Sequence, residues 1–439
     1  MDHFSSLRGV GLFLSSALLL AVACGDDEDD GGMIILPDGG NNNNGGSNNN
    51  GGSNDAGSDD GGSNNAGSDD GGADNGGAGV GGDDAGTDGG DTAVPADDCD
   101  GDGAVEPLYQ LVVLDPNQLT HIPTAINNRG QITSSARNEE DARAAWFWDG
   151  EQGHFINGER SDGPGNASDV NDDGQVVGNA QFLRDYPEMQ GTFQFRTRPF
   201  LYQDGTVTDL PVLGGNSMGR AEGINAAGDI VGTTFGGPGE QHAFLYADGS
   251  MIDIGRGQAL AINRHRQVVG YLTDPLEVPH AFLFQLTDGG APAQDLGTLG
   301  GESSRAYAIN DEGEIVGHAQ KATGLFSAFL YRDGAMAELP APGVESNALG
   351  INNHGHIVGN FSTADFADLV FGYLYRDGQM IVLGEAIENS HCWTSIQVAD
   401  INDRGDIVGL ATTAADPPSE CTDPPRSLVV LTQYPQDYQ

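Results

Sequence analysis

The chain has 439 residues, of which 65 are acidic and only 18 are basic, so its formal net charge at neutral pH is −47. Such a chain has no basic stripe that could neutralise phosphates, which disfavours nucleic acid and anionic membrane surfaces as partners and predicts no nucleic-acid partner. The same balance favours solubility and partners that are cations or polar neutral molecules.

The first 24 residues are typical of an export signal. Arg8 precedes an apolar stretch from Val10 to Val22, which is too short to span a membrane comfortably and ends in "LAVAC". The small residues before Cys24 resemble the cleavage box of bacterial lipoproteins. Residues 1–23 are therefore predicted to be a lipoprotein signal peptide, with Cys24 lipid-modified and anchored in the bacterial envelope, at the outer membrane or cell surface. An ordinary secretory cleavage site is the alternative.

Residues 24–104 are predicted to form a disordered tether. This segment is rich in Gly, Asn, Ser and Asp and holds 20 acidic and no basic residues, so burial cannot offset its ordering entropy. A Gly-rich coil of this length reaches roughly 50 Å. Its last part, "DCDGDG", has carboxylates at the alternate positions of a calcium loop, although Tyr109 stands where a final carboxylate ligand is needed. The calcium candidates there are Asp98, Asp100 and Asp102.

Residues 105–439, with 44 acidic and 17 basic side chains, contain seven copies of one pattern. In each copy an apolar residue is followed by Asn, two variable residues, Gly or its replacement, one variable residue and two apolar residues, as in "INDEGEIVG" from Ile309. The spacing of about 46 residues is the size of one propeller blade. The repeated asparagines are Asn127, Asn171, Asn225, Asn263, Asn310, Asn352 and Asn402.

A second motif follows each of the first six Asn motifs, for example "HAFLYADG" in the third copy. Both motifs predict two strands joined by a tight turn, so one copy predicts four short strands. The last copy ends with one strand at 426–431 and lacks a fourth, whereas an unused strand begins at Tyr109. Pairing the two would close a ring and remove its open edges. The sequence predicts an all-β fold, a seven-bladed β-propeller whose last blade is closed by both termini.

These residues also resemble a known family. The tripeptide His-Ala-Phe at His242 and His280, with "DLGTLGGESSRAYAINDEGEIVG" from Asp295, is similar to the HAF-repeat family of bacterial extracellular proteins. The resemblance covers roughly residues 107–431. The tripeptide is intact only in these two copies, and Arg266 replaces one turn glycine. The resemblance implies an exported repeat protein without a defined reaction.

The repeated turn residues are interpreted as scaffold. Asn can accept a hydrogen bond from the backbone two residues on, and Gly three residues later can take the left-handed conformation. Arg266 should therefore distort its hairpin or take a costly positive φ. His354 and His356 in "INNHGHIVG" occupy positions where other copies carry Arg, Asp, Glu or Gln, so the fold does not demand histidine there.

Other candidate chemical groups are few. His242 and His280 are predicted to be structural, each with a ring nitrogen satisfied by a neighbouring blade. No Gly-x-Ser-x-Gly elbow and no helical His pair is present, and no cofactor is expected. Carboxylate pairs for glycoside chemistry stay open among the many acidic residues. "DVNDDG" has calcium-loop spacing, but the other copies do not maintain it; its candidates are Asp169, Asn171 and Asp173.

The face opposite the tight turns is predicted to bind a partner. The longest connections between second and third strands are expected at 179–198 and 410–426, in copies that flank the first one. Aromatic and arginine side chains on loops of a rigid scaffold are typical interface anchors. The alternative is that these aromatics pack on a neighbouring blade. The candidate binding face consists of Phe182, Arg184, Tyr186, Phe193, Phe195, Arg196, Arg198 and Trp393.

Two of the four cysteines are predicted to pair. Outside the cytoplasm Cys392 and Cys421 should form a disulfide, which closes a loop of about 30 residues and contributes about 3 kcal/mol. The state of Cys99 stays open.

The leading hypothesis is a surface-anchored, non-catalytic propeller lipoprotein, monomeric, that binds or adheres to a protein or glycan. The alternative is a polysaccharide-active propeller enzyme, a hydrolase or lyase with carboxylates around the central channel. A further alternative is a structural envelope protein without a dedicated ligand.

Overall fold

The computed structural model describes residues 107–114, 120–137, 143–156, 165–184, 194–215, 218–236, 240–286, 292–364, 366–413, 418–419, 421, 423 and 426–434. All of them fall in one of the chain's two units, Val94–Gln439. The predicted signal peptide and tether, including Cys24, Asp98, Cys99, Asp100 and Asp102, lie outside the described residues. None of the helices in these ranges is long and apolar enough to cross a membrane.

Four antiparallel strands joined by consecutive hairpins form the repeating unit, which we call a blade. Blade 1 contains β2 (Ile122–Ile126), β3 (Ile132–Arg137), β4 (Arg143–Trp148) and β5 (Gly153–Phe155). Blade 2 contains β6 (Gly165–Val170), β7 (Val176–Arg184), β8 (Gln194–Gln203) and β9 (Thr206–Asp209). Blade 3 contains β10 (Met218–Ile224), β11 (Ile230–Phe235), β12 (Gln241–Ala247) and the first part of β13 (Ser250–Ile262).

The long strand β13 serves two blades, because its first part pairs with β12 and its second part with β14. Blade 4 therefore contains the second part of β13, β14 (Gln267–Thr273), β15 (Pro279–Gln285) and β16 (Gln294–Asp295). Blade 5 contains β17 (Gly300–Ile309), β18 (Ile315–Lys321), β19 (Phe326–Arg332) and β20 (Ala335–Glu338). Blade 6 contains β21 (Glu345–Ile351), β22 (Ile357–Thr363), β23 (Phe366–Arg376) and β24 (Gln379–Val382). Short 3-10 turns occur at Leu213–Gly215, Leu383–Glu385 and Ser390–Cys392.

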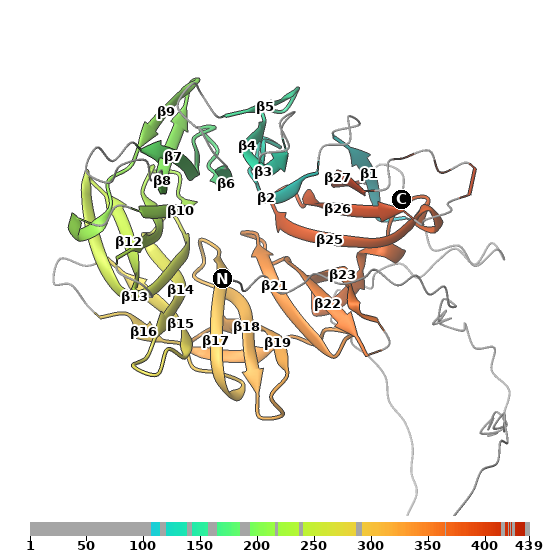
Figure 1. Cartoon of the computed structure of the whole chain (residues 1–439). Coiled ribbons are helices and arrows are strands. Elements are labelled where there is room, and N and C mark those ends of the chain that lie inside the picture. The colour runs from blue at the N-terminus through green and yellow to red at the C-terminus, as the bar shows by residue number, and fades with distance from the viewer. Residues whose placement is uncertain are drawn as a thin grey trace, which may run out of the picture. The chain divides into compact units, whose positions relative to one another are not determined.

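The two ends of the described chain close the last blade. Blade 7 contains β25 (Trp393–Ile401), β26 (Ile407–Thr413), β27 (Arg426–Gln433) and, from the other end of the chain, β1 (Tyr109–Val113). The pairing of β1 with β27 is antiparallel, with Tyr109 opposite Gln433 and Val113 opposite Val429. Figure 1 shows the blades following one another around a ring in chain order, with β1 beside β27. The protein is an all-β propeller, and the predicted fold class is confirmed.

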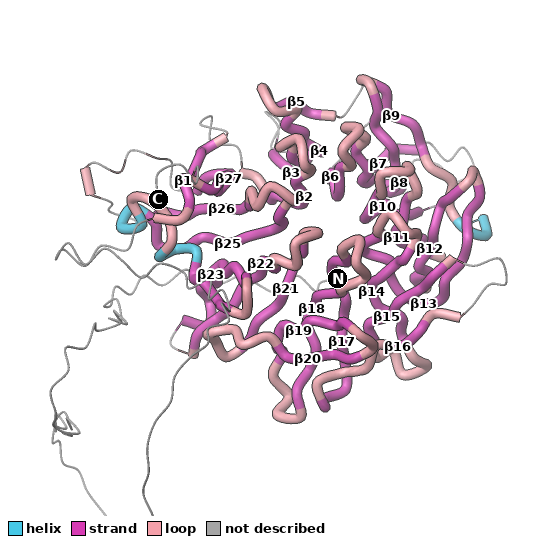
Figure 2. Tube along the Cα trace, turned by 180° about the vertical axis from the view of Figure 1, so that it is seen from behind, coloured by secondary structure: helices cyan, strands magenta, loops and turns pink. Residues whose placement is uncertain are grey.

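Apolar side chains between adjacent blades hold the ring together. Phe147 of blade 1 packs with Val176 and Phe200 of blade 2, and Trp146 of blade 1 packs with Val408 of blade 7. Strands present alternate residues to opposite faces, so both faces of each blade supply such contacts. The seam between the first and last blades is thus packed in the same way as the others. Figure 2 shows the same ring from behind.

The strand nearest the axis of each blade contains a β-bulge at an equivalent position. The register shifts between Pro123 and Ala125 in β2, and between Ala221 and Gly223 in β10. Equivalent shifts occur in β6, β13, β17, β21 and β25. The residue at the shift, three before the turn Asn, has no ladder partner on the second strand. Bulges re-aim side chains, and here they do so seven times around one axis.

Candidate functional site

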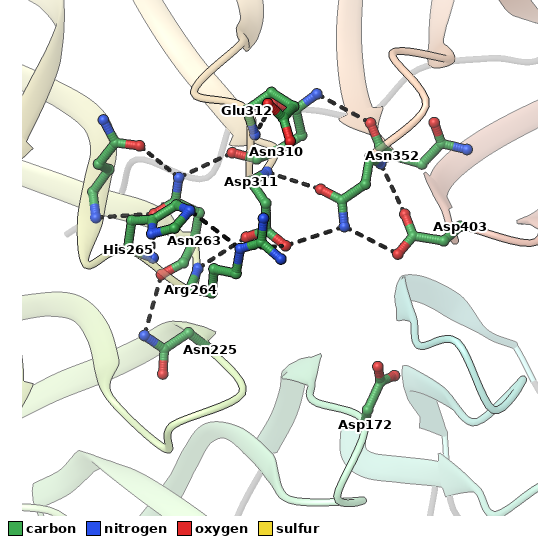
Figure 3. Close-up of polar contacts among 12 residues, drawn as sticks. Asp172, Asn225, Asn263, Arg264, His265, Asn310, Asp311, Glu312, Asn352 and Asp403 are labelled. Carbon is green, nitrogen blue, oxygen red and sulfur yellow. Dashed lines mark hydrogen bonds and ion pairs between the residues drawn. The ribbon is translucent and has the colours of Figure 1, made fainter.

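The repeated asparagines form a closed circle that we call the turn ring. In the first copy Asn127 Oδ1 accepts hydrogen bonds from the backbone N–H groups of Arg129 and Gln131, at 3.0 and 2.9 Å. This geometry recurs in all copies and confirms the predicted turn role. In each copy the Asn Nδ2 group also donates to the backbone carbonyl of the next copy's Asn, and the circle closes from Asn402 to Asn127 at 3.0 Å. Figure 3 shows Asn225, Asn263, Asn310 and Asn352 in this arrangement.

A second set of contacts lies beside it, among the residues that directly follow the turn asparagines. We call this set the mouth ring: Asn128, Asp172, Ala226, Arg264, Asp311, Asn353 and Asp403. The backbone N–H of one member donates to the side chain of the next, as from Asp311 to Asn353 Oδ1 at 2.8 Å. The same contact joins Asn353 to Asp403, Asp403 to Asn128, Asn128 to Asp172 and Arg264 to Asp311. Figure 3 shows Arg264 beside Asp311. The chain of contacts is interrupted at Ala226, whose methyl group can neither donate nor accept.

A cavity of about 330 Å³ lies inside these rings, between the seven inner strands. It is lined by the seven residues at the bulges, a set that we call the channel layer. These residues are Thr124, Ser168, Glu222, Leu260, Tyr307, Leu349 and Ala399. The first three are polar and come from consecutive blades 1 to 3, and the other four, from blades 4 to 7, are apolar or aromatic. The channel therefore has one polar side and one apolar side.

Two carboxylates beside this layer bind the backbone of a neighbouring blade. Asp169 Oδ2 accepts a hydrogen bond from Ile224 N at 2.9 Å, and Asp400 Oδ2 accepts one from Ile126 N at 3.0 Å. Burial raises the pKa of Asp169, and it raises the pKa of Asp400 to about 7. The negative charge of Asp169 raises the pKa of Asp400 further. Both side chains therefore act as bridges between blades.

Glu222 is the third carboxyl group of the channel. Burial raises its pKa to about 7, against the lowering effects of the Arg220 charge and a hydrogen bond with Ser168. Near neutral pH the group is therefore close to half protonated, so it can both donate and accept a hydrogen bond. Sequence reasoning missed Glu222 and Tyr307, because a simple alternation of strand residues does not reveal a bulge. Aligning the residue three before each turn Asn would have grouped them.

The calcium candidates of blade 2 are engaged elsewhere. Asp169 binds backbone N–H groups, Asn171 Oδ1 accepts from the N–H groups of Asp173 and Gln175, and the exposed Asp173 carboxylate lies 3.7 Å from Arg129. The three side chains therefore do not converge on one point.

The two motif histidines are partnered within their own blades, so the expectation of a neighbouring-blade partner is wrong. His242 Nδ1 lies 3.1 Å from Asp253 Oδ2, and His280 Nδ1 lies 3.0 Å from Asp295 Oδ2. Each Asp stands on the outer strand that pairs with the His strand. Each of these aspartates also accepts a hydrogen bond from the backbone N–H two residues later, that of Gly255 for Asp253 and that of Gly297 for Asp295.

The predicted connection at 179–198 is a strand hairpin for much of its length, which corrects that expectation. The ladder of β7 with β8 continues to the pair Arg184 and Gln194, and it includes Phe182 opposite Arg196 and Leu183 opposite Phe195. Antiparallel pairing simply extends outward past the blade. We call this hairpin the arm. Arg198 is half-buried at its base, and Tyr186 and Phe193 lie outside the described residues.

The second predicted connection, 410–426, also begins as strand, since β26 runs to Thr413. The predicted disulfide between Cys392 and Cys421 is present, which ties this connection to the start of β25. Trp393, next to the disulfide, is partly buried against the core of blade 7 and not fully presented to solvent.

No family model matches the chain, and no curated protein matches it. Similar solved structures include the β-propeller domain of the Trilobed protease from Pyrococcus furiosus, at 12% identity and TM-score 0.46, covering 72% of this chain and 97% of that one. TolB from Acinetobacter baumannii is 12% identical with TM-score 0.36, covering 58% of this chain and 61% of that one. A gluconolactonase from Xanthomonas campestris is 12% identical with TM-score 0.37, covering 75% and 92%.

Proposed function

We propose that the protein is an exported, lipid-anchored propeller of the bacterial cell surface that binds a protein or glycan partner without turning it over. The arm is the observation that carries this proposal. Its two strands are paired at nine positions, from Val176 opposite Tyr202 to Arg184 opposite Gln194. The equivalent hairpin of blade 3, for comparison, is paired at six.

The arm also has open edges among the described residues. β6 pairs with β7 only as far as Ala180, and β9 pairs with β8 only as far as Phe200. The Pro199 carbonyl still accepts a hydrogen bond from Leu210 N at 2.9 Å. Beyond Ala180 on β7 and Pro199 on β8, the outer edges have no strand beside them in the described part of the chain. A rigid scaffold that carries an extended hairpin whose sequence contains Phe and Arg residues matches the composition of binding surfaces.

The hydrogen bonds that two of the channel carboxylates make favour binding without turnover. Glycoside hydrolysis needs two carboxyl groups facing the scissile bond, one as acid and one as base or nucleophile. Asp169 and Asp400 instead accept backbone hydrogen bonds from a neighbouring blade. Among the three channel carboxyl groups, Glu222 combines a pKa of about 7 with a hydrogen bond to a side chain, that of Ser168, which favours the second candidate, a polysaccharide-active enzyme.

Binding and turnover can be measured side by side. The mature chain is applied to arrays of envelope glycans and surface proteins, and the same glycans are incubated with it and analysed for products. We expect a retained partner and no product. Product without a retained partner would instead establish the enzyme.

The arm is tested by a combined variant, Phe182→Ala, Arg184→Ala, Phe195→Ala and Arg196→Ala. We expect loss of the partner retained by the native chain, with the thermal unfolding midpoint preserved. The control carries substitutions in another hairpin tip, Arg332→Ala and Asp333→Asn, and should bind normally. Equal binding by the arm variant and the control would place the partner site away from the arm.

A further inference from the structure

The channel has the features of a small-molecule site that is separate from the arm. Its volume of about 330 Å³ is at the lower end of the range of ligand pockets, roughly 300–1,000 Å³. The residue at each of the seven bulges is part of its lining, and bulges are frequent beside functional sites.

The lining restricts the ligand class. Ser168 and Glu222 form a hydrogen-bonding wall, and Leu260, Tyr307 and Leu349 form an apolar wall opposite. A wholly apolar ligand would leave the first wall with only the hydrogen bond between Ser168 and Glu222 and would use none of the wall's remaining donors and acceptors. An anion would meet Asp169, Asp400 and the acidic members of the mouth ring. A bare cation would find no ligand atoms on the apolar wall.

We propose that the channel binds one six-membered sugar ring, neutral in charge. Its C–H face would lie against Tyr307 and the two leucines, and its hydroxyl groups would bond to Ser168 and Glu222. Aromatic rings offer an extended apolar surface for such a face. A carboxyl group near half protonation can satisfy a hydroxyl group in either direction, as donor or as acceptor.

The mouth ring supports access on the same side as Glu222. Its hydrogen bonds join blades 4 to 7 and 1 to 2, and the interruption is at Ala226 in blade 3. Glu222 stands on the inner strand of the same blade, four residues before Ala226, which lies in the turn that follows the strand. The gap in these hydrogen bonds therefore lies in the blade that carries Glu222.

Titration calorimetry of the mature chain tests the site with glucose, galactose, mannose and N-acetylglucosamine as probes. Glucitol, an acyclic polyol without a ring face, is the matched ligand control. We expect saturable binding of at least one cyclic sugar and an association constant for glucitol lower by at least about tenfold. The absence of saturable binding for all four sugars at millimolar concentrations overturns the proposal.

Single variants test whether the polar wall and the apolar wall of the channel each contribute to sugar binding. Glu222→Leu, a change to an apolar side chain of similar size, should lower the association constant by about tenfold or more, since it removes the carboxyl group that donates to and accepts from the sugar hydroxyls. Tyr307→Phe keeps the ring face and should bind normally, whereas Tyr307→Ala should not bind. Glu312→Gln, on the same face but outside the cavity lining, is the control. Circular dichroism checks that each variant is folded. Sugar binding that is unchanged in both Glu222→Leu and Tyr307→Ala overturns the assignment to the channel.

Discussion

At the scale of single residues, Arg266 shows how a repeat tolerates a departure from its own pattern. It occupies the position of the turn glycine and has a φ of 60°, in the left-handed region that a long side chain rarely adopts. Its guanidinium contacts two carboxylates of blade 3, the buried Asp229 at 2.9 Å and the exposed Asp248 at 2.9 Å. Asp229 itself stands where most other copies have Gln or Glu. The arginine and the aspartate thus compensate each other.

This pairing predicts that a single variant at Arg266 is less stable than the native chain, whereas a double variant at both positions is at least as stable as the native chain. Arg266→Gly relieves the backbone but leaves Asp229 buried without its cation, so we expect a lower urea midpoint. Arg266→Gly with Asp229→Gln recreates the turn of the first two copies, in which Gln accepts from the Asn amide. The double variant should regain or exceed the native midpoint. If it is no more stable than the single variant, the compensation is refuted.

Asp400 carries a prediction about pH. Its pKa rises on folding from an ordinary value near 3.8 to about 7, so the folded state binds the proton more tightly than the unfolded state. Stability from this group is therefore present below the unfolded pKa and is lost as pH rises from about 4 through 7. Asn at this position is neutral at every pH, and its Oδ1 atom can still accept from Ile126 N.

We accordingly expect Asp400→Asn to match the native chain at pH 4 and to unfold at a higher temperature at pH 8. Each kcal/mol corresponds to about 3 °C in the unfolding midpoint for a domain of this kind. Asp333→Asn, an exposed turn residue with a φ of 53°, is the control and should change nothing. An Asp400→Asn advantage that is equal at both pH values would contradict the linkage.

At the scale of elements, the mouth ring offers a direct test at its gap. In the Ala226→Asn variant, the new Oδ1 atom would accept a hydrogen bond from Asp172 N, and the new Nδ2 group would donate to the Asp172 carboxylate. Asn353 makes contacts of both kinds, because its Oδ1 atom accepts from Asp311 N and its Nδ2 group donates to the carboxylates of Asp311 and Asp403. We expect a gain of about 1 kcal/mol in the free energy of unfolding, measured by urea denaturation. Ala227→Asn, one residue on and equally exposed, has no such neighbours and serves as the control. A variant at 226 that is no more stable than the one at 227 would show that the gap is not a missing contact.

The same elements show what a single sequence can and cannot predict. Strand order, the Asn–Gly turns and the Cys392–Cys421 pair follow from local patterns and from the count of copies, so they were predictable. The donation from each turn Asn to the next copy crosses about 46 residues, and no local pattern contains it. The bulges are also invisible in an alternating pattern, which hid Glu222 and Tyr307. In the arm, residues taken for a loop continue the ladder because strand length depends on the pairing partner.

At the scale of the whole molecule, ring closure depends on a strand supplied by the far end of the chain. Tyr109 of β1 is 1% exposed and packs in the core of blade 7, and Tyr109 N also donates to Ala386 O at 3.1 Å. Without β1, the strand β27 would be an open edge with its backbone groups ready to pair with another chain. Closure should therefore control both stability and oligomeric state.

A pair of truncations tests this dependence. The form lacking residues 1–104 retains β1 and should unfold at the same temperature as the mature chain. The form lacking residues 1–114 loses the Tyr109 core contacts, at a cost of about 4 kcal/mol. Its unfolding midpoint should fall by about 10 °C. Light scattering should show it associating through β27.

A synthetic peptide of residues 107–115 should restore the midpoint in proportion to its concentration, because it binds only the folded ring. If the shorter form stays monomeric with an unchanged midpoint, β1 does not close the propeller.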